Sequence, residues 1–459
     1  MPELEVTNWF GDLVSHPRVI VEAHSVDDIV AVFKDSSKYP SPIRAVGSNH
    51  STERCGVADG GTLIKMKMNR ILKITAESVT VEAGAIYIDI AEALEKQNLQ
   101  LYVNTEIGNL TAGSAACAGT KDSSFPGEYG QVGSYVTGFK MVLPSGELLE
   151  VTDAQPELMR KMRSSHGLFG IVYEVTLRIR TMLPMAVRHE TFSLEDFVGR
   201  LPELTARNEA MMLYIFPFDN KISVEFRKYN PGASDPPSRH GWKFRNYFWG
   251  KVGPKFAHDI ERDISDPKVR YGIVDAFNAT WRFNLEHIVS SDNTIAADQI
   301  IRYPPTSDDS RYTFSFFAFP EEQYGATLAD YFKFSRDYYS QKGYRSNMLS
   351  VGYRVAKDQQ ALLSYSQDGN MITIDPVSTA NPGWTQFLEA YNKFCSDRGG
   401  IPLLNQTPGL TREIARKAFG DRLDTLEATR RTYDPENRLL NGFFKDLLAE
   451  PGVRSSTAG

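Results

Sequence analysis

The sequence predicts an α+β fold, because helix and strand patterns alternate in its first part and strand patterns dominate later. A capping box, Ser25-Val26-Asp27-Asp28, precedes apolar residues at helical spacing and predicts a helix over 26–34. A second helix is expected over 86–97, where apolar residues recur every three or four positions. Runs rich in β-branched residues predict strands at 19–22, 43–46, 63–66, 71–74 and 79–82.

The strand pattern continues and then changes character near residue 184. A hairpin is expected at 138–143 and 148–151, joined by Pro144-Ser145-Gly146, and a longer strand at 170–179 closes a first domain, residues 1–183. Beyond it the chain is richer in aromatic residues, and an antiparallel sheet flanked by helices is expected in residues 184–400. Its predicted strands are 312–319, 348–355, 361–366 and 371–376, with a helix at 324–341, and two further helices at 411–419 and 423–432 belong to a C-terminal segment, residues 401–459.

Composition limits the class of protein and its partners. The chain has 459 residues, of which 41% are hydrophobic and 24% charged, so it is long enough to bury a large core. A net charge of −6 argues against nucleic acid or an anionic membrane as the main partner. No run of 18 apolar residues predicts an integral membrane segment, and no secretory signal is recognised. We therefore expect a cytoplasmic protein that acts on a small molecule.

The three cysteines predict neither a disulfide framework nor a metal site. Cys55, Cys117 and Cys395 are too few and too scattered for either arrangement. We expect ordinary thiols and no bound metal.

Glycine and other small residues gather in loops that could face a phosphate-bearing ligand. One such run is Gly47-Ser48-Asn49-His50-Ser51, directly after the predicted strand 43–46, and another extends from Thr111 to Thr120 almost without a bulky side chain. Glycine permits positive φ and close approach of backbone N–H groups to a pyrophosphate. No Gly-x-Gly-x-x-Gly follows a predicted strand, so a Rossmann dinucleotide site is not expected.

The order of these blocks resembles the PCMH-type FAD-binding domain of the vanillyl-alcohol-oxidase superfamily, and within it the sugar-lactone and alditol oxidases. Those enzymes read Gly-x-Gly/Arg-His-Ser where this chain has Gly47 to Ser51. The resemblance covers residues 8–180 and, less closely, the ending that begins Tyr433-Asp434-Pro435. It implies an FAD-binding domain over 1–183, a substrate-binding cap over 184–400 and a C-terminal segment, 401–459, that returns to the FAD domain.

The resemblance also implies which residues contact FAD. They are Val46, Gly47, Ser48, Asn49, His50, Ser51, Thr111, Gly113, Ser114, Cys117, Gly119, Thr120, Gly170, Ile171 and Val172. His50 matches the histidine that bonds covalently to the flavin methyl carbon in relatives with this motif. The alternative is a histidine that only hydrogen-bonds the cofactor or packs beneath it. For Asn441, a turn-capping amide is weighed equally against a flavin contact.

The implied substrate site departs from the family pattern. Gly352-Tyr353-Arg354 stands where relatives carry a Glu-x-Arg pair, and Leu403-Leu404-Asn405-Gln406 where they carry His-Trp-x-Lys. The lost polar groups make a polyol or sugar lactone less favoured as substrate. Tyr353, Arg354, Asn405 and Gln406 are expected to contact the substrate, with a salt bridge as the alternative for Arg354 and a core position for Tyr353.

Two basic segments have competing interpretations. Lys121 follows Gly119-Thr120, where a histidine is common in the family, so it is expected to act near the flavin; a solvent-facing lysine is the alternative. Residues 242–251 interleave basic and aromatic side chains. We expect a partly buried cap helix with Lys243, Arg245 and Lys251 in solvent, and contact with a lipid-borne or apolar substrate is the alternative.

Together these features predict an FAD-dependent oxidase that acts on CH-OH donors. A hydride would pass from a small alcohol substrate to flavin N5, with O2 as acceptor giving H2O2. One alternative is a flavin dehydrogenase that passes electrons to a quinone or protein acceptor. The other is a flavin-binding module without turnover, suggested by the missing glutamate, histidine and lysine.

Overall fold

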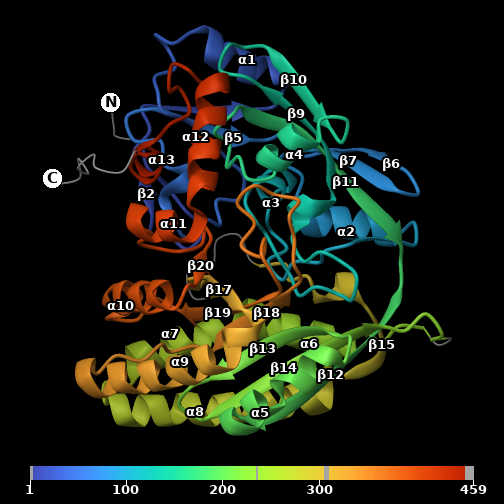
Figure 1. Ribbon diagram of the computed structural model, residues 1–459, viewed down its shortest axis with the longest axis vertical. Coiled ribbons are helices and arrows are strands. Elements are labelled where there is room, and N and C mark those ends of the chain that lie inside the picture. Colours follow the sequence, from blue (N-terminus) through green and yellow to red (C-terminus); the bar gives the residue numbers. More distant parts are fainter. Residues whose placement is uncertain (1–3, 234–235, 304–309, 450–459) are drawn as a thin grey trace.

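Helices and strands interleave in two regions of the chain. The computed structural model describes residues 4–233, 236–303 and 310–449 of the protein. The first region and the C-terminal helices lie together above a large sheet with its own helices (Figure 1). The predicted α+β class is confirmed.

The first region contains a small parallel sheet and a larger antiparallel one. The parallel sheet has the order β3-β5-β4, with β3 at Val19–Ala23, β4 at Ile43–Val46 and β5 at Thr62–Met66. The antiparallel sheet has the order β10-β9-β11-β7-β6, and β8 also pairs with β11. Its strands are β6 (Ile71–Ile74), β7 (Ser78–Glu82), β8 (Leu99–Leu101), β9 (Val136–Val142), β10 (Leu148–Thr152) and β11 (Ile171–Thr181), while β1 (Val6–Thr7) and β2 (Val14–Ser15) pair separately.

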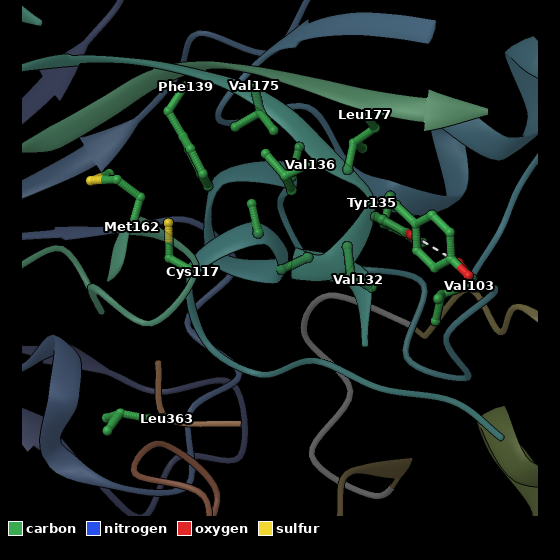
Figure 2. Packing of buried hydrophobic residues seen from close by; sticks show 14 of the residues in the cluster. Val103, Cys117, Val132, Tyr135, Val136, Phe139, Met162, Val175, Leu177 and Leu363 are labelled. Carbon is green, nitrogen blue, oxygen red and sulfur yellow. Dashed lines mark hydrogen bonds between the residues drawn. The ribbon is translucent and has the colours of Figure 1, made fainter. Parts of the chain in front are cut away.

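Short helices pack against these sheets. Ser25 accepts the Asp28 N–H and Asp28 accepts the Ser25 N–H, so the predicted capping box starts α1. Phe139, Val175 and Leu177 point from β9 and β11 toward α3, which carries Cys117 (Figure 2). The helices are α1 (Val26–Lys34), α2 (Tyr87–Glu95), α3 (Ala112–Cys117) and α4 (Pro156–Met162), with 3-10 turns at η1 (Arg54–Gly56) and η2 (Val132–Tyr135).

The second region is built on a nine-stranded antiparallel sheet in the order β15-β12-β14-β13-β18-β19-β17-β20, with β16 paired to β19. Its strands are β12 (Pro184–Ser193), β13 (Ala210–Phe216), β14 (Lys221–Tyr229), β15 (Ser291–Ile295), β16 (Thr313–Phe314), β17 (Phe317–Pro320), β18 (Ser350–Val355), β19 (Met371–Ser378) and β20 (Ile401–Pro402).

Helices cover both faces of this sheet, so its central strand is buried throughout. Along β13, Met211, Leu213 and Ile215 pack with α5, α9 and α10, whereas Met212 and Tyr214 pack with α6 and α8. The elements are α5 (Leu194–Ala206), α6 (His240–Tyr247), α7 (Gly253–Asp263), α8 (Pro267–Asn284), α9 (Glu321–Lys342) and α10 (Trp384–Asp397), with π-helical turns η3 (Phe248–Val252) and η4 (Leu285–Val289) and the 3-10 turn η5 (Ala296–Gln299).

Two predicted strands differ from the structure. The strand predicted at 361–366 is wrong: these residues form buried turns. The Leu362 N–H donates to Arg160 O and the Leu363 N–H to Ser164 Oγ, both at 2.9 Å, so the turns bond to the first region. The strand predicted at 312–319 is split into β16 and β17, and the interruption lies opposite Pro376, which has no N–H to donate.

The C-terminal segment returns to the first region, beside which its helices lie in Figure 1. Ile43 N–H donates to Arg438 O at 2.7 Å, and the Arg438 guanidinium donates to Phe33 O and Tyr39 O. Asn441 donates to the carbonyls of η1 and accepts the Phe444 N–H, so it has the capping role. The helices are α11 (Arg412–Phe419), α12 (Asp421–Tyr433) and α13 (Gly442–Leu448).

Candidate active site

A cavity with an empty volume of about 1050 Å³ opens where the loops after β4, around α3 and before β11 meet residues 405–406. The lining residues that the sequence predicted are Val46, Gly47, Asn49, His50, Ser51, Thr111, Gly113, Ser114, Cys117, Thr120, Gly170, Ile171, Val172, Asn405 and Gln406. Ser48 and Gly119 do not line it; Gly119 instead makes the turn before Thr120, with φ at +68°.

Glycines in the cavity wall bring the loops against each other. A Cβ on Gly47 would lie 2.2 Å from Thr111 Oγ1, and one on Gly113 would lie 2.9 Å from Ala83 Cβ. The missing side chains therefore make room for neighbouring protein atoms. At Gly113 the Cβ position faces Ala83, so the absent side chain lets α3 pack against that residue.

His50 stands in the cavity wall as a neutral imidazole. Its ring stacks on Trp9 with centroids 4.7 Å apart, and desolvation lowers the pKa of His50 to about 3. Nε2 is buried and has no hydrogen-bond partner among the described residues. A neutral ring with a free nitrogen can serve as nucleophile or hydrogen-bond partner for a ligand in this cavity.

Arg44 and His166 also line this cavity and were not predicted as site residues. The buried Arg44 guanidinium donates to Cys55 O at 2.9 Å, Leu439 O at 3.0 Å and His166 O at 2.6 Å. It thereby joins β4 to η1, the loop before β11 and the C-terminal segment. The sequence signal was present, because Arg44 lies two residues before Val46 on a predicted strand and so shares its face.

A second cavity, with an empty volume of about 720 Å³, adjoins the first and shares Leu110, Thr120 and Gln406 with it. Most of its wall comes from the large sheet and from aromatic side chains. The other lining residues are Thr105, Glu106, Ile107, Lys121, Met212, Trp249, Tyr303, Tyr312, Phe314, Val351, Tyr353, Asp375 and Val377.

Lys121 and Asp375 form a buried ion pair in this second cavity. Lys121 Nζ lies 2.9 Å from Asp375 Oδ2, and the two side chains are 9% and 3% exposed. The solvent-facing alternative for Lys121 is therefore wrong. Burial raises the pKa of Asp375 to about 6, although the Lys121 charge opposes the shift. Asp375 was missed by the sequence interpretation.

Glu106 supplies a second carboxylate, which is engaged at both oxygens. One oxygen pairs with the Arg245 guanidinium and the other accepts the Tyr353 hydroxyl. The prediction that Arg245 reaches solvent is wrong, because its side chain is fully buried on α6 beneath the cavity; Lys243 and Lys251 are exposed as predicted. Tyr353 lines the cavity and also packs in a buried hydrophobic cluster, so its expected contact with the substrate stays a prediction.

Arg354 lies outside both cavities. Its guanidinium pairs with Glu321 at 2.6 Å and 3.2 Å, which is the salt-bridge alternative. The reason is the alternation of β18: Tyr353 faces the second cavity, so the next residue points to the other face of the sheet.

Residues 17–152 match the family model of the FAD binding domain. Similar curated proteins include L-gulonolactone oxidase of Bos taurus, 24% identical over 245 residues, 53% of this chain and 54% of that protein. L-gulono-1,4-lactone dehydrogenase of Mycobacterium tuberculosis is 21% identical over 444 residues, 96% of this chain and 98% of that protein. Among solved structures, cholesterol oxidase from B. sterolicum aligns with a TM-score of 0.78 at 16% identity, covering 97% of each chain.

Residues 17–152 therefore carry an FAD-binding domain, and the chain has the fold of this cholesterol oxidase. The predicted α+β fold is confirmed, and the match supports the predicted FAD cofactor. The chain spans about half the length of the bovine oxidase that it matches.

Among the described residues, no helix is both long and apolar enough to cross a membrane, and no group of three or more His, Cys, Asp or Glu is placed to hold a metal ion. Cys55, Cys117 and Cys395 are buried free thiols.

Proposed function

We propose that this flavoprotein oxidises a CH-OH group of a small organic molecule by hydride transfer to flavin N5, with O2 as acceptor giving H2O2. The observation that carries the proposal is the meeting of two cavities at Leu110, Thr120 and Gln406. The first is lined largely by loops of the matched FAD-binding domain, and the second has the mostly apolar lining typical of a small-molecule site. A substrate in the second cavity would therefore lie against a cofactor in the first.

The residues of the first cavity fit FAD. His50 Nε2 and Asn405 Oδ1 are buried polar atoms without partners among the described residues, so a ligand that supplies partners is favoured there. When bound, FAD supplies a two-electron acceptor. We propose that His50 attaches it covalently, because the ring is neutral and its free nitrogen lies in the cavity wall.

The second cavity favours a neutral alcohol with an apolar body. Its charged groups are paired with each other, Lys121 with Asp375 and Glu106 with Arg245. An ionic substrate would therefore find no unpaired counter-charge among the described lining residues. The apolar wall, which includes Met212, offers few partners for the many hydroxyls of a polyol, and unpaired hydroxyls are costly to bury.

A flavin dehydrogenase is the second candidate, because one similar protein that matches nearly the whole chain is named a dehydrogenase. Cytoplasmic location and the division into residues 1–183, 184–400 and 401–459 stay predictions. The proposed oxidase is tested by aerobic turnover of a panel of neutral alcohols, with carbonyl product and peroxide both quantified. One peroxide per carbonyl formed supports the oxidase. Turnover that requires a quinone and yields no peroxide supports the dehydrogenase instead.

A further inference from the structure

We infer that Asp375, held in place by Lys121, accepts the hydroxyl proton of the substrate; this rests on the proposed alcohol oxidation. Three features of the second cavity carry the inference. Asp375 lies in the cavity wall, only one of its two carboxylate oxygens has a partner among the described residues, and the other carboxylate of the wall, Glu106, is paired at both oxygens.

One carboxylate oxygen of Asp375 is fixed and the other is free. Oδ2 accepts a hydrogen bond from Lys121 Nζ at 2.9 Å, whereas Oδ1 has no partner among the described residues. Ionised carboxylates accept hydrogen bonds at both oxygens, so a buried free oxygen favours a ligand that donates one. The hydroxyl of an alcohol is such a donor, and a general base must lie within hydrogen-bond reach of the proton that it takes.

Lys121 positions this carboxylate next to the first cavity. It directly follows Thr120, which lines both cavities. Its ammonium also lies 4.5 Å from the centre of the Phe316 ring and 4.4 Å from that of Tyr353. Two rings and a carboxylate therefore hold the lysine, whose charge stabilises the ionised form of Asp375.

The other carboxylate of the wall is less suited to take a proton. Glu106 is occupied by Arg245 at one oxygen and by Tyr353 at the other. Hydrogen bonding and a paired cation both stabilise a carboxylate in its charged form and weaken it as a base. Asp375 has one cation and one free oxygen, so it is the better proton acceptor of the two.

Burial supports the same assignment, because the pKa of Asp375 is raised to about 6 and a base titrating near working pH transfers protons efficiently. The titratable groups that interact electrostatically with Asp375 come from several elements. Lys121 from the loop after α3, Tyr353 from β18 and Tyr365 from the buried turns lie on its own side of the sheet, whereas Tyr324 and Tyr331 from α9 and Tyr391 and Cys395 from α10 pack on the opposite face.

The oxidation conserves atoms and electrons when FAD, the cofactor of the proposed function, takes up the hydride. The O–H bond breaks and its proton passes to Asp375 Oδ1, while the electron pair of that bond forms the carbonyl π bond. The C–H bond breaks at the same carbon and its hydrogen leaves with both electrons, so the substrate loses two electrons and FAD gains them. Asp375 then returns its proton to solvent before the next turnover.

The test compares Asp375→Asn with wild type and with Glu321→Gln, a matched carboxylate-to-amide change in an ion pair outside both cavities. Single-turnover flavin reduction by an alcohol is measured from pH 5 to 9, beside FAD content and the infrared carboxyl band. We expect Asp375→Asn to slow reduction by about 10²–10⁴-fold with FAD content retained. We also expect it to remove a carboxyl band that titrates near pH 6 in wild type. Asp375→Glu should recover part of the rate, and Glu321→Gln should behave as wild type.

A wild-type rate or an unchanged carboxyl band in Asp375→Asn would overturn the inference and leave the proposed function standing. No reduction of wild type by any alcohol would overturn both. If Asp375→Asn does not fold, Lys121→Met provides the test. Loss of the cation should move both the pH dependence of the flavin-reduction rate and the titration of the carboxyl band to higher pH. A profile that does not move would also overturn the inference.

Discussion

Replacing Gly47 with alanine tests whether the contact between two loops shapes the first cavity, which we propose binds FAD. The new Cβ would lie 2.2 Å from Thr111 Oγ1 and 2.4 Å from Thr111 Cγ2, well inside normal contact. Either the threonine rotates and loses its 2.7 Å hydrogen bond to Ser114 Oγ, or the loop moves away from α3. Overpacking of this kind costs about 1–3 kcal/mol. If the loop can relax only by leaving its cofactor-binding position, FAD binding weakens by about 5- to 150-fold.

The assay is FAD content per purified chain together with calorimetric titration of apo-protein with FAD. Gly199→Ala is the control, because this glycine lies in α5 with no atom within 4 Å of the added Cβ. The double variant Gly47→Ala/Thr111→Gly removes the threonine side chain that the new Cβ would meet. It should recover most of the affinity for FAD, since glycine is accepted at a helix N-cap. Wild-type affinity in the single variant, or no recovery in the double variant, would refute the reasoning.

Three further outcomes are expected. Arg354→Ala should lower stability by about 0.2–1 kcal/mol, the range for a partly exposed ion pair, and leave the reduction rate per flavin unchanged; a slowed rate in stopped-flow would return Arg354 to the substrate site. Wild-type protein precipitated with acid should keep its flavin whereas His50→Ala releases it, and free flavin from wild type would contradict covalent attachment. Apo-protein stability should fall as pH drops from about 6.5 toward 3.

That pH dependence follows from two histidines that line the FAD cavity. Desolvation lowers the pKa of both His50 and His166 to about 3, so on unfolding below pH about 6.5 each takes up a proton that the folded state does not bind. Between about pH 6.5 and 3, each histidine lowers the free energy of unfolding by at most about 1.4 kcal/mol for every pH unit of the fall. Above about pH 6.5 neither histidine lowers it. Denaturant titrations of His166→Asn should show a shallower fall; asparagine suits the left-handed backbone there, φ +48°. An unchanged slope would mean that His166 is protonated in the fold.

The lining of the first cavity could be predicted largely from sequence because its wall comes from short loops with recognisable local patterns. Residues Gly47 to Ser51 follow one strand directly, and Thr111 to Thr120 form one small-residue run around α3. Glycine positions, helix caps and strand patterns each depend on residues that are close in the sequence. They can therefore be recognised without knowledge of tertiary contacts.

The second cavity could not be predicted in the same way because long-range pairs define it. Lys121 and Asp375 are 254 positions apart in the chain, and Glu106 meets Arg245 from a different element. One sequence signal was available: Asp375 interrupts the apolar strand Met371–Ser378, which is buried throughout. A carboxylate within such a strand needs a partner or a function. The buried turns at 361–366 were mistaken for a strand because their apolar residues pack inward without pairing to a neighbour.

The central claim is that a bound FAD accepts electrons from an alcohol in the adjoining cavity. Anaerobic mixing of the purified holoprotein with neutral alcohols of increasing apolar size tests it most directly, with flavin absorbance as the readout. The account predicts that at least one such alcohol bleaches the oxidised flavin in a single turnover and that an equimolar carbonyl product appears. Flavin that stays oxidised with every alcohol, while a chemical reductant still bleaches it, would contradict the account.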